Sequence, residues 1–137
     1  MTTATPQVPV SWGEVIDKIT ILEIKSEKLT APDALANVRT ELALLAGVAR
    51  EALAENDRLS DLKAQLQSVN QALWDIEDEI REKEARQVFD DGFIALARSV
   101  YRQNDARAAI KRQINDLLGS EIVEEKSYQP YLADGPT

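Results

Sequence analysis

The sequence predicts an all-α protein, an antiparallel helical bundle or coiled-coil hairpin of about four helices with flexible tails at both ends. Residues 33–129 contain no proline and only three glycines, so little interrupts long helices there. Aliphatic residues recur along that stretch at steps of three and four, the period of a helix with one buried face. Residues 1–10 and 129–137 are rich in Thr, Pro and Gly, which is typical of tails without regular structure.

The composition indicates a single globular domain over residues 11–128, with 44% hydrophobic and 29% charged residues in a chain of 137. The chain has no cysteine and no histidine, which excludes disulfides, thiol nucleophiles, Cys/His zinc sites and Ser-His-Asp triads. A net charge of -8 argues against nucleic-acid partners. Without a membrane-length apolar run or a signal peptide pattern, we expect a cytoplasmic protein with no membrane insertion.

Two shorter helices are predicted first, over about residues 11–29 and 31–53. Ser11 suits the N-cap of the first, with Glu14 in a capping-box arrangement. Thr30 is the predicted cap of the second, with Pro32 in its first turn. The stripe predicted to be buried in the second helix consists of Leu35, Val38, Leu42, Leu45, Ala49 and Ala52.

Two longer helices follow, over about residues 58–88 and 92–118. The third helix has the most regular seam, at Leu59, Leu62, Leu66, Val69, Leu73, Ile76 and Ile80. Its phase does not continue that of the second helix, so a turn is predicted at residues 54–58. An aspartate cap in residues 89–92 begins the fourth helix, and Gly119 ends it.

A polar layer interrupts the seam of the fourth helix at Gln103 and Arg107. If the two long helices fold back near residue 90, these positions lie at the level of residues 73–76. We therefore expect Arg107 to meet a carboxylate, and the nearby acids on the third helix are Asp75, Glu77 and Asp78. The first helix can add the charged residues Asp17, Lys18, Glu23 and Lys25 to this layer. Such a layer either fixes the register of the helices or forms a binding site.

A site at this layer would bind an anionic or polar small molecule. Arg107, Lys111 and Lys18 would supply positive charge, and Trp74 or Tyr101 an apolar wall. The full set of candidate ligand-binding residues is Lys18, Glu23, Trp74, Glu77, Tyr101, Asn104, Asp105, Arg107 and Lys111. No catalytic residue, metal ligand or cofactor is predicted.

The acidic residues Glu79 and Glu82 stand one helical turn apart. This spacing is similar to the first half of the E-x-x-E motif of all-α nucleotide pyrophosphatases, which bind magnesium. The second half, E-x-x-D on the following helix, is missing. A solvated charged face is the other interpretation, and magnesium enters only if the protein hydrolyses nucleotides.

Several longer stretches resemble a bacterial family of small all-helical proteins classed as a domain of unknown function. They are GEVIDK with TILEIK in the first helix, LWDIED in the third, FIALARSVYRQNDARAAIK in the fourth, and EEKSY after it. The resemblance spans most of residues 11–128. It implies an all-helical fold and carries no known activity.

The leading functional hypothesis is a non-enzymatic helical interaction or accessory module that self-associates, as a dimer, or binds a protein partner. It rests on the heptad seams and the lack of a catalytic set. The alternative is a small-molecule-binding protein, or a metal-dependent nucleotide or sugar-nucleotide hydrolase, with its site at the polar layer. Whether residues 120–131 dock on the helices is left open by the sequence.

Overall fold

The structure is a computed structural model that describes residues 2–131, and within that range it contains four helices and no strand. They are α1 (Trp12–Lys28), α2 (Pro32–Ala52), α3 (Asp57–Ala85) and α4 (Asp91–Leu118). The predicted all-α class is confirmed.

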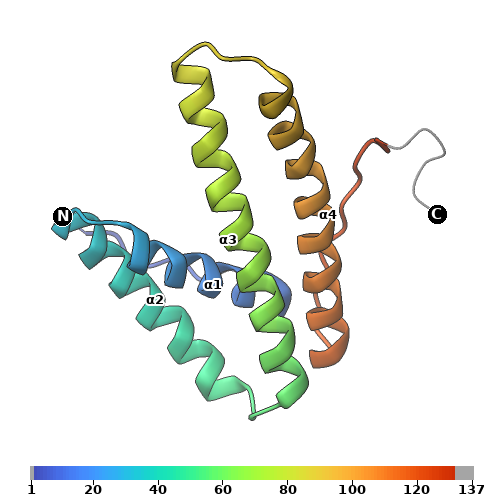
Figure 1. Cartoon of the computed structure of the whole chain (residues 1–137). Coiled ribbons are helices and arrows are strands. Elements are labelled where there is room, and N and C mark those ends of the chain that lie inside the picture. The colour runs from blue at the N-terminus through green and yellow to red at the C-terminus, as the bar shows by residue number, and fades with distance from the viewer. Residues whose placement is uncertain (1, 132–137) are drawn as a thin grey trace.

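The four helices form two antiparallel hairpins that cross each other. Figure 1 shows α3 and α4 side by side, with the shorter pair α1 and α2 lying across one end of them. α1 packs against all three other helices, whereas the backbone of α2 approaches only α1. The structure is therefore a long hairpin, formed by α3 and α4, with a shorter hairpin, formed by α1 and α2, laid against it.

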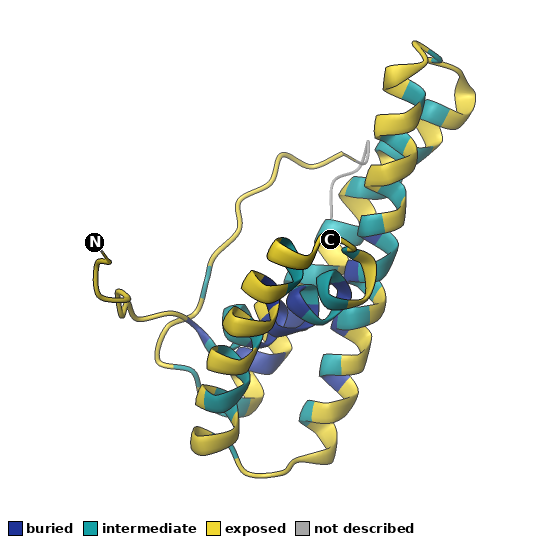
Figure 2. Ribbon diagram, turned by 90° about the vertical axis from the view of Figure 1, so that its left-hand side faces the viewer, coloured by how far each residue is buried: buried dark blue, intermediate teal, exposed yellow. Residues whose placement is uncertain are grey.

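The core lies where α1 crosses the long hairpin. Its buried residues come from three helices, α1, α3 and α4, and are Ile16, Ile19, Leu62, Leu66, Ile110 and Ile114. Figure 2 shows these buried positions gathered at the crossing, while the far end of the long hairpin is more exposed. All seven predicted seam residues of α3 are buried or half-buried, as the periodicity requires.

Polar side chains cap the N-termini of three of the helices. Ser11 Oγ accepts a hydrogen bond from the Glu14 N–H at 3.2 Å, as predicted, and Asn56 and Asp90 cap α3 and α4 in the same way. The Thr30 cap is wrong. Because Pro32 is the first residue of α2, the cap position falls on Ala31, which has no side-chain acceptor.

α3 ends at Ala85, three residues before the predicted end. Gln87 takes a left-handed φ of 58°, and the N–H groups of Gln87 and Val88 donate to the carbonyls of Glu84 and Lys83. This pair of bonds is a Schellman motif, which usually has glycine at the left-handed position. Glutamine there carries no such sequence signal, so the end of the helix was missed.

The last helix ends at Gly119 as predicted, with a left-handed φ of 61°. The chain then reverses, and residues 120–131 run back beside α4 (Figure 1). Residues 2–10 and 129–131 contain no helix or strand, in agreement with the predicted tails; residue 1 and residues 132–137 lie outside the described range. None of the helices between residues 2 and 131 has the length and hydropathy needed to span a membrane.

Candidate functional site

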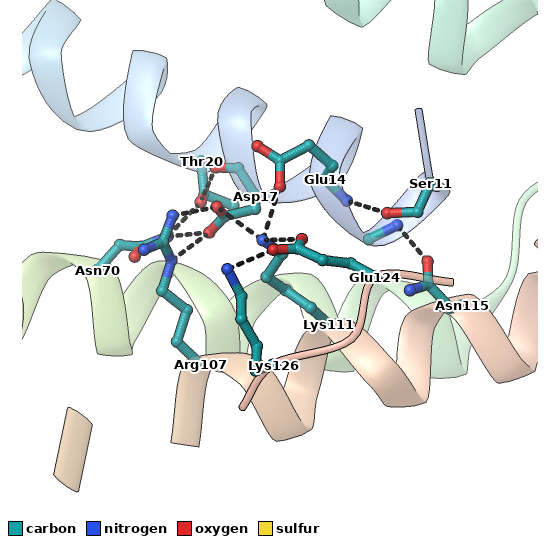
Figure 3. A network of polar contacts seen from close by, with 11 residues as sticks. Ser11, Glu14, Asp17, Thr20, Asn70, Arg107, Lys111, Asn115, Glu124 and Lys126 are labelled. Carbon is teal, nitrogen blue, oxygen red and sulfur yellow. Dashed lines mark hydrogen bonds and ion pairs between the residues drawn. The ribbon is translucent and has the colours of Figure 1, made fainter. Parts of the chain in front are cut away.

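A fully buried carboxylate, Asp17 of α1, is the centre of a polar network between the two hairpins (Figure 3). Arg107 of α4 binds it with two nitrogens: Nε donates to Oδ1 at 3.0 Å, and an end nitrogen of the guanidinium donates to Oδ2. Asn70 of α3 donates to the same Oδ1 at 2.8 Å. A buried charge is tolerated only when it is paired in this way, so Asp17 joins three helices.

Thr20 completes the inner half of the network. Its hydroxyl donates to the Asp17 carbonyl at 2.7 Å and accepts from Asn70 at 2.9 Å. Asn70 thereby donates to both Asp17 and Thr20, and between residues 2 and 131 no buried side-chain polar atom is left unpaired. The site is therefore preorganised by its own hydrogen bonds.

Lys111 of α4 forms the outer half. Only 9% of its side chain is exposed, and its Nζ lies 2.7 Å from Glu14, 3.1 Å from Glu124 and 3.7 Å from Asp17. Burial alone would lower the pKa of Lys111, but these carboxylates outweigh it and raise the pKa above its ordinary value. Hydrogen bonding to Asp17 likewise raises the pKa of Arg107.

The segment after α4 closes the network. Glu124 pairs with Lys126 as well as with Lys111. The hydrogen bond from Lys126, and to a smaller extent that from Lys111, lowers the pKa of Glu124 from 4.5 to about 2. Three carboxylates (Glu14, Asp17, Glu124) then face three cations (Arg107, Lys111, Lys126), so the network has no net formal charge. Such a cluster holds the helices and the segment together, and because its net charge is zero, it does not attract a charged ligand over a distance.

Gly13 brings the start of α1 against α4. Its N–H donates to Asn115 Oδ1 at 2.6 Å, and a Cβ built at this position would lie 2.7 Å from the Lys111 carbonyl oxygen. Only glycine allows this approach, which sets Glu14 and Asp17 over the cations of α4.

The structure corrects the predicted partner of Arg107. Its carboxylate comes from Asp17 of α1, and not from Asp75, Glu77 or Asp78. The prediction named the acids of the third helix as partners and Asp17 only as an addition from the first helix, but α1 lies over that level and Asp17 supplies the buried charge. Asp75 instead accepts a hydrogen bond from Gln71 within α3.

Two open pockets flank Arg107. One, of about 210 Å³, lies between α4 and the segment after it, and its lining includes Asn104, Arg107 and Lys111. The other, of about 150 Å³, lies between the hairpins, with Trp74, Glu77, Asn104 and Arg107 in its lining. Trp74 and Glu77 of α3 thus line the same pocket as Asn104 and Arg107 of α4.

The other candidate residues lie apart from these pockets. Lys18 pairs with Glu41 of α2 at 3.0 Å, and Glu23 pairs with Lys63 of α3 at 2.9 Å. Tyr101 is 55% exposed and stacks on Tyr131 with 6.0 Å between ring centroids. Asp105 is exposed on α4.

Sequence reasoning did not single out most of the network. Asp17 was expected only as one of several charged residues that the first helix could add, and the omitted residues are Gly13, Thr20, Asn70, Asn115 and Glu124. One signal was present, because Gly13, Asp17, Thr20 and Ile24 follow one another at steps of four, three and four, which places them on one face of α1. All four are buried.

Among residues 2–131 no group of three or more acidic side chains is placed to hold a metal ion. No curated protein and no solved structure matches the chain. A family model described as a family of unknown function, DUF6165, matches residues 6–136, nearly the whole length. The chain therefore belongs to this family of unknown function.

Proposed function

We propose that the protein is a non-enzymatic helical interaction module that self-associates through the outward flank of α2. The observation that carries the proposal is the incomplete packing of this helix, whose backbone approaches that of α1 and neither of the long helices. A helix held on one side exposes whatever apolar surface the single partner does not cover.

The apolar arc of α2 is too wide for one partner. At about 100° per residue its leucine and valine side chains spread over about 180° of the helix surface, and its alanines widen this arc. α1 covers the middle of this arc, where Val38 is buried. On the outward flank Leu44 is 60% exposed and Val48 is 52% exposed, and their spacing of four residues makes them one stripe.

The opposite flank of α2 is also incompletely filled. A groove of about 470 Å³ lies between α2, α1 and the start of α3, with Ile16, Leu53 and Leu59 in its lining. Pairing of α2 with the same helix of a second copy would bury the outward stripe on both chains at once, which is the usual geometry of a homodimer. This arrangement is the form of self-association that the exposed side chains favour.

The state of the polar network supports a non-enzymatic role. Its cations and carboxylates are paired with one another, and Arg107 is held by Asp17 with two nitrogens. A catalytic acid or base must exchange a proton with substrate, whereas these groups are occupied by their neighbours.

The test is a pair of matched substitutions. Val48→Glu places a charge on the α2 flank, and Ile94→Glu places one on α4 at an equal exposure of 52%. We expect light scattering after size exclusion to give a dimer for the unmodified protein and for Ile94→Glu, and a 15.2 kDa monomer for Val48→Glu. Equal masses for the two variants would contradict the α2 interface.

A second candidate function is small-molecule binding in the 150 Å³ pocket. Trp74, Glu77 and Asn104 line it, and none of their side chains takes part in a hydrogen bond or ion pair with residues 2–131. Free donors and acceptors beside an aromatic wall are what a polar ligand needs. Metal-dependent hydrolysis of nucleotides or sugar nucleotides would require magnesium in addition.

Thermal unfolding separates this candidate from the first. Nucleotides and sugar nucleotides, each with and without magnesium, raise the melting temperature if they bind the native state. Trp74→Ala should remove such a rise, while Tyr101→Ala, outside the pocket, should retain it. No rise with any of these compounds would count against the site.

A further inference from the structure

The C-terminal segment, defined here as residues 120–131, is held on α4 by three side-chain contacts. Glu124 pairs with Lys111 and Glu125 with Arg112, each at 3.1 Å. Tyr131 stacks on Tyr101, three helical turns before Arg112 in α4. Two adjacent acidic residues of the segment thus pair with two adjacent basic residues of α4, and an aromatic pair follows. We call the α4 residues Tyr101, Lys111 and Arg112 the docking face.

The spacing of these contacts fits an extended chain running antiparallel to α4. Six residues from Glu125 to Tyr131 span about 20 Å when extended, and eleven residues from Arg112 back to Tyr101 span about 17 Å of helix. The docking face is therefore complementary to this segment in length as well as in charge.

Outside the Glu124–Lys111 pair, the attachment of the segment is exposed and has no backbone part. Residues 121–131 form no backbone hydrogen bond with the helices in the part of the chain that the structure describes. The outer ion pair is largely in water, with side-chain exposures of 50% for Arg112 and 77% for Glu125. Exposed pairs of this kind contribute little to stability. The inner pair of Glu124 with Lys111, whose side chain is 9% exposed, contributes more, and an exchanged segment must form the same pair again.

A hinge joins the segment to the helix. Gly119 has a left-handed φ of 61°, and nothing lies within 4 Å of a Cβ built there. Ser120, the next residue, is tied to the bundle ahead of these three contacts: it accepts a hydrogen bond from the Trp12 N–H at 3.2 Å and donates its own N–H to the Asn115 carbonyl at 2.9 Å. A change of backbone angles at Gly119 would redirect the segment without disturbing α4.

We propose that the docking face of one chain binds the C-terminal segment of a second copy, so that the two chains exchange these segments. A second copy carries the same two acids and tyrosine, and exchange replaces each contact within the chain by an identical contact between chains. The inference rests on the proposed self-association, because pairing through α2 raises the local concentration of the second segment.

Disulfide trapping tests the exchange, since the chain has no cysteine of its own. Two singly substituted chains, Arg112→Cys and Glu125→Cys, are mixed and oxidised mildly. We expect a covalent heterodimer well above that from a control mixture of Arg86→Cys with Glu125→Cys. Arg86 is the matched control, because it is 60% exposed and lies at the far end of the long hairpin.

The doubly substituted chain, Arg112→Cys with Glu125→Cys, reports whether the segment docks within one chain. If this variant closes an internal disulfide while the mixture yields no more heterodimer than the control, the exchange is wrong. Light scattering of the same samples before oxidation separates the two proposals. A dimer without mixed disulfide overturns the exchange alone, whereas a monomer overturns the α2 pairing on which it rests.

Discussion

A buried charge at a single residue, Asp17, determines how the two hairpins meet. Asn70 of α3 and Arg107 of α4 both donate hydrogen bonds to this carboxylate. Thr20, in the same helix as Asp17, donates to the Asp17 backbone carbonyl. Removing one partner of such a pair leaves the other charge partly desolvated, which costs far more than an exposed pair is worth. The polar network is thus a specific link between elements that aliphatic packing alone would hold less precisely.

Asp17→Asn should lower the free energy of unfolding by about 2 to 4 kcal/mol, below the full cost for a buried pair because Arg107 is partly exposed. Urea denaturation measures the change. Asp61→Asn is the control, since Asp61 forms an exposed ion pair with Arg58 and should cost less than about 1 kcal/mol. Equal effects of the two substitutions would contradict the role of Asp17.

Glycine at position 13 should be indispensable for packing, although alanine favours helices. In Gly13→Ala the new Cβ meets the Lys111 carbonyl at 2.7 Å, so we expect a loss of about 1 to 3 kcal/mol. Gly47→Ala in α2, where the nearest atom lies at 3.9 Å, should instead add about 0.5 to 1 kcal/mol. Melting temperatures that move in the same direction would refute this contrast.

At the scale of elements, periodicity and caps predicted the four helices well. The seam of α3 and the left-handed Gly119 could be read from residue type and spacing alone. The C-terminal end of α3 and the choice of Asp17 as the partner of Arg107 could not. A glutamine does not predict a left-handed residue, so Gln87 gave no signal for the end of α3. The position of α1 over the long hairpin depends on packing between helices, and the spacing of residues within each helix does not predict such packing.

Gln87→Gly should stabilise the protein by about 0.5 kcal/mol, because glycine avoids the left-handed cost of about 1 kcal/mol while adding freedom to the unfolded chain. Glu84→Gly, one turn earlier and inside α3, should destabilise it by about 1 kcal/mol. Thermal or urea unfolding of both variants checks the pair. A loss of stability in Gln87→Gly would show that the end of α3 is held by other contacts.

Across the whole molecule, docking of the C-terminal segment should depend on pH. The folded pKa of Glu124, about 2, is below its ordinary 4.5, so its carboxylate contributes to docking above pH 4.5. That contribution should be lost as the pH falls from about 4.5 to about 2. Amide NMR signals of residues 120–131 report the change, and Glu124→Gln should show weaker docking with no transition in this window.

The crossed arrangement leaves the backbone of α2 beside α1 alone, and the proposed self-association through its outward flank rests on that shape. Sedimentation equilibrium of the unmodified protein over a wide concentration range measures this directly. We predict a reversible rise from the 15.2 kDa chain mass to twice that value. A single species of chain mass up to several hundred micromolar protein would contradict it.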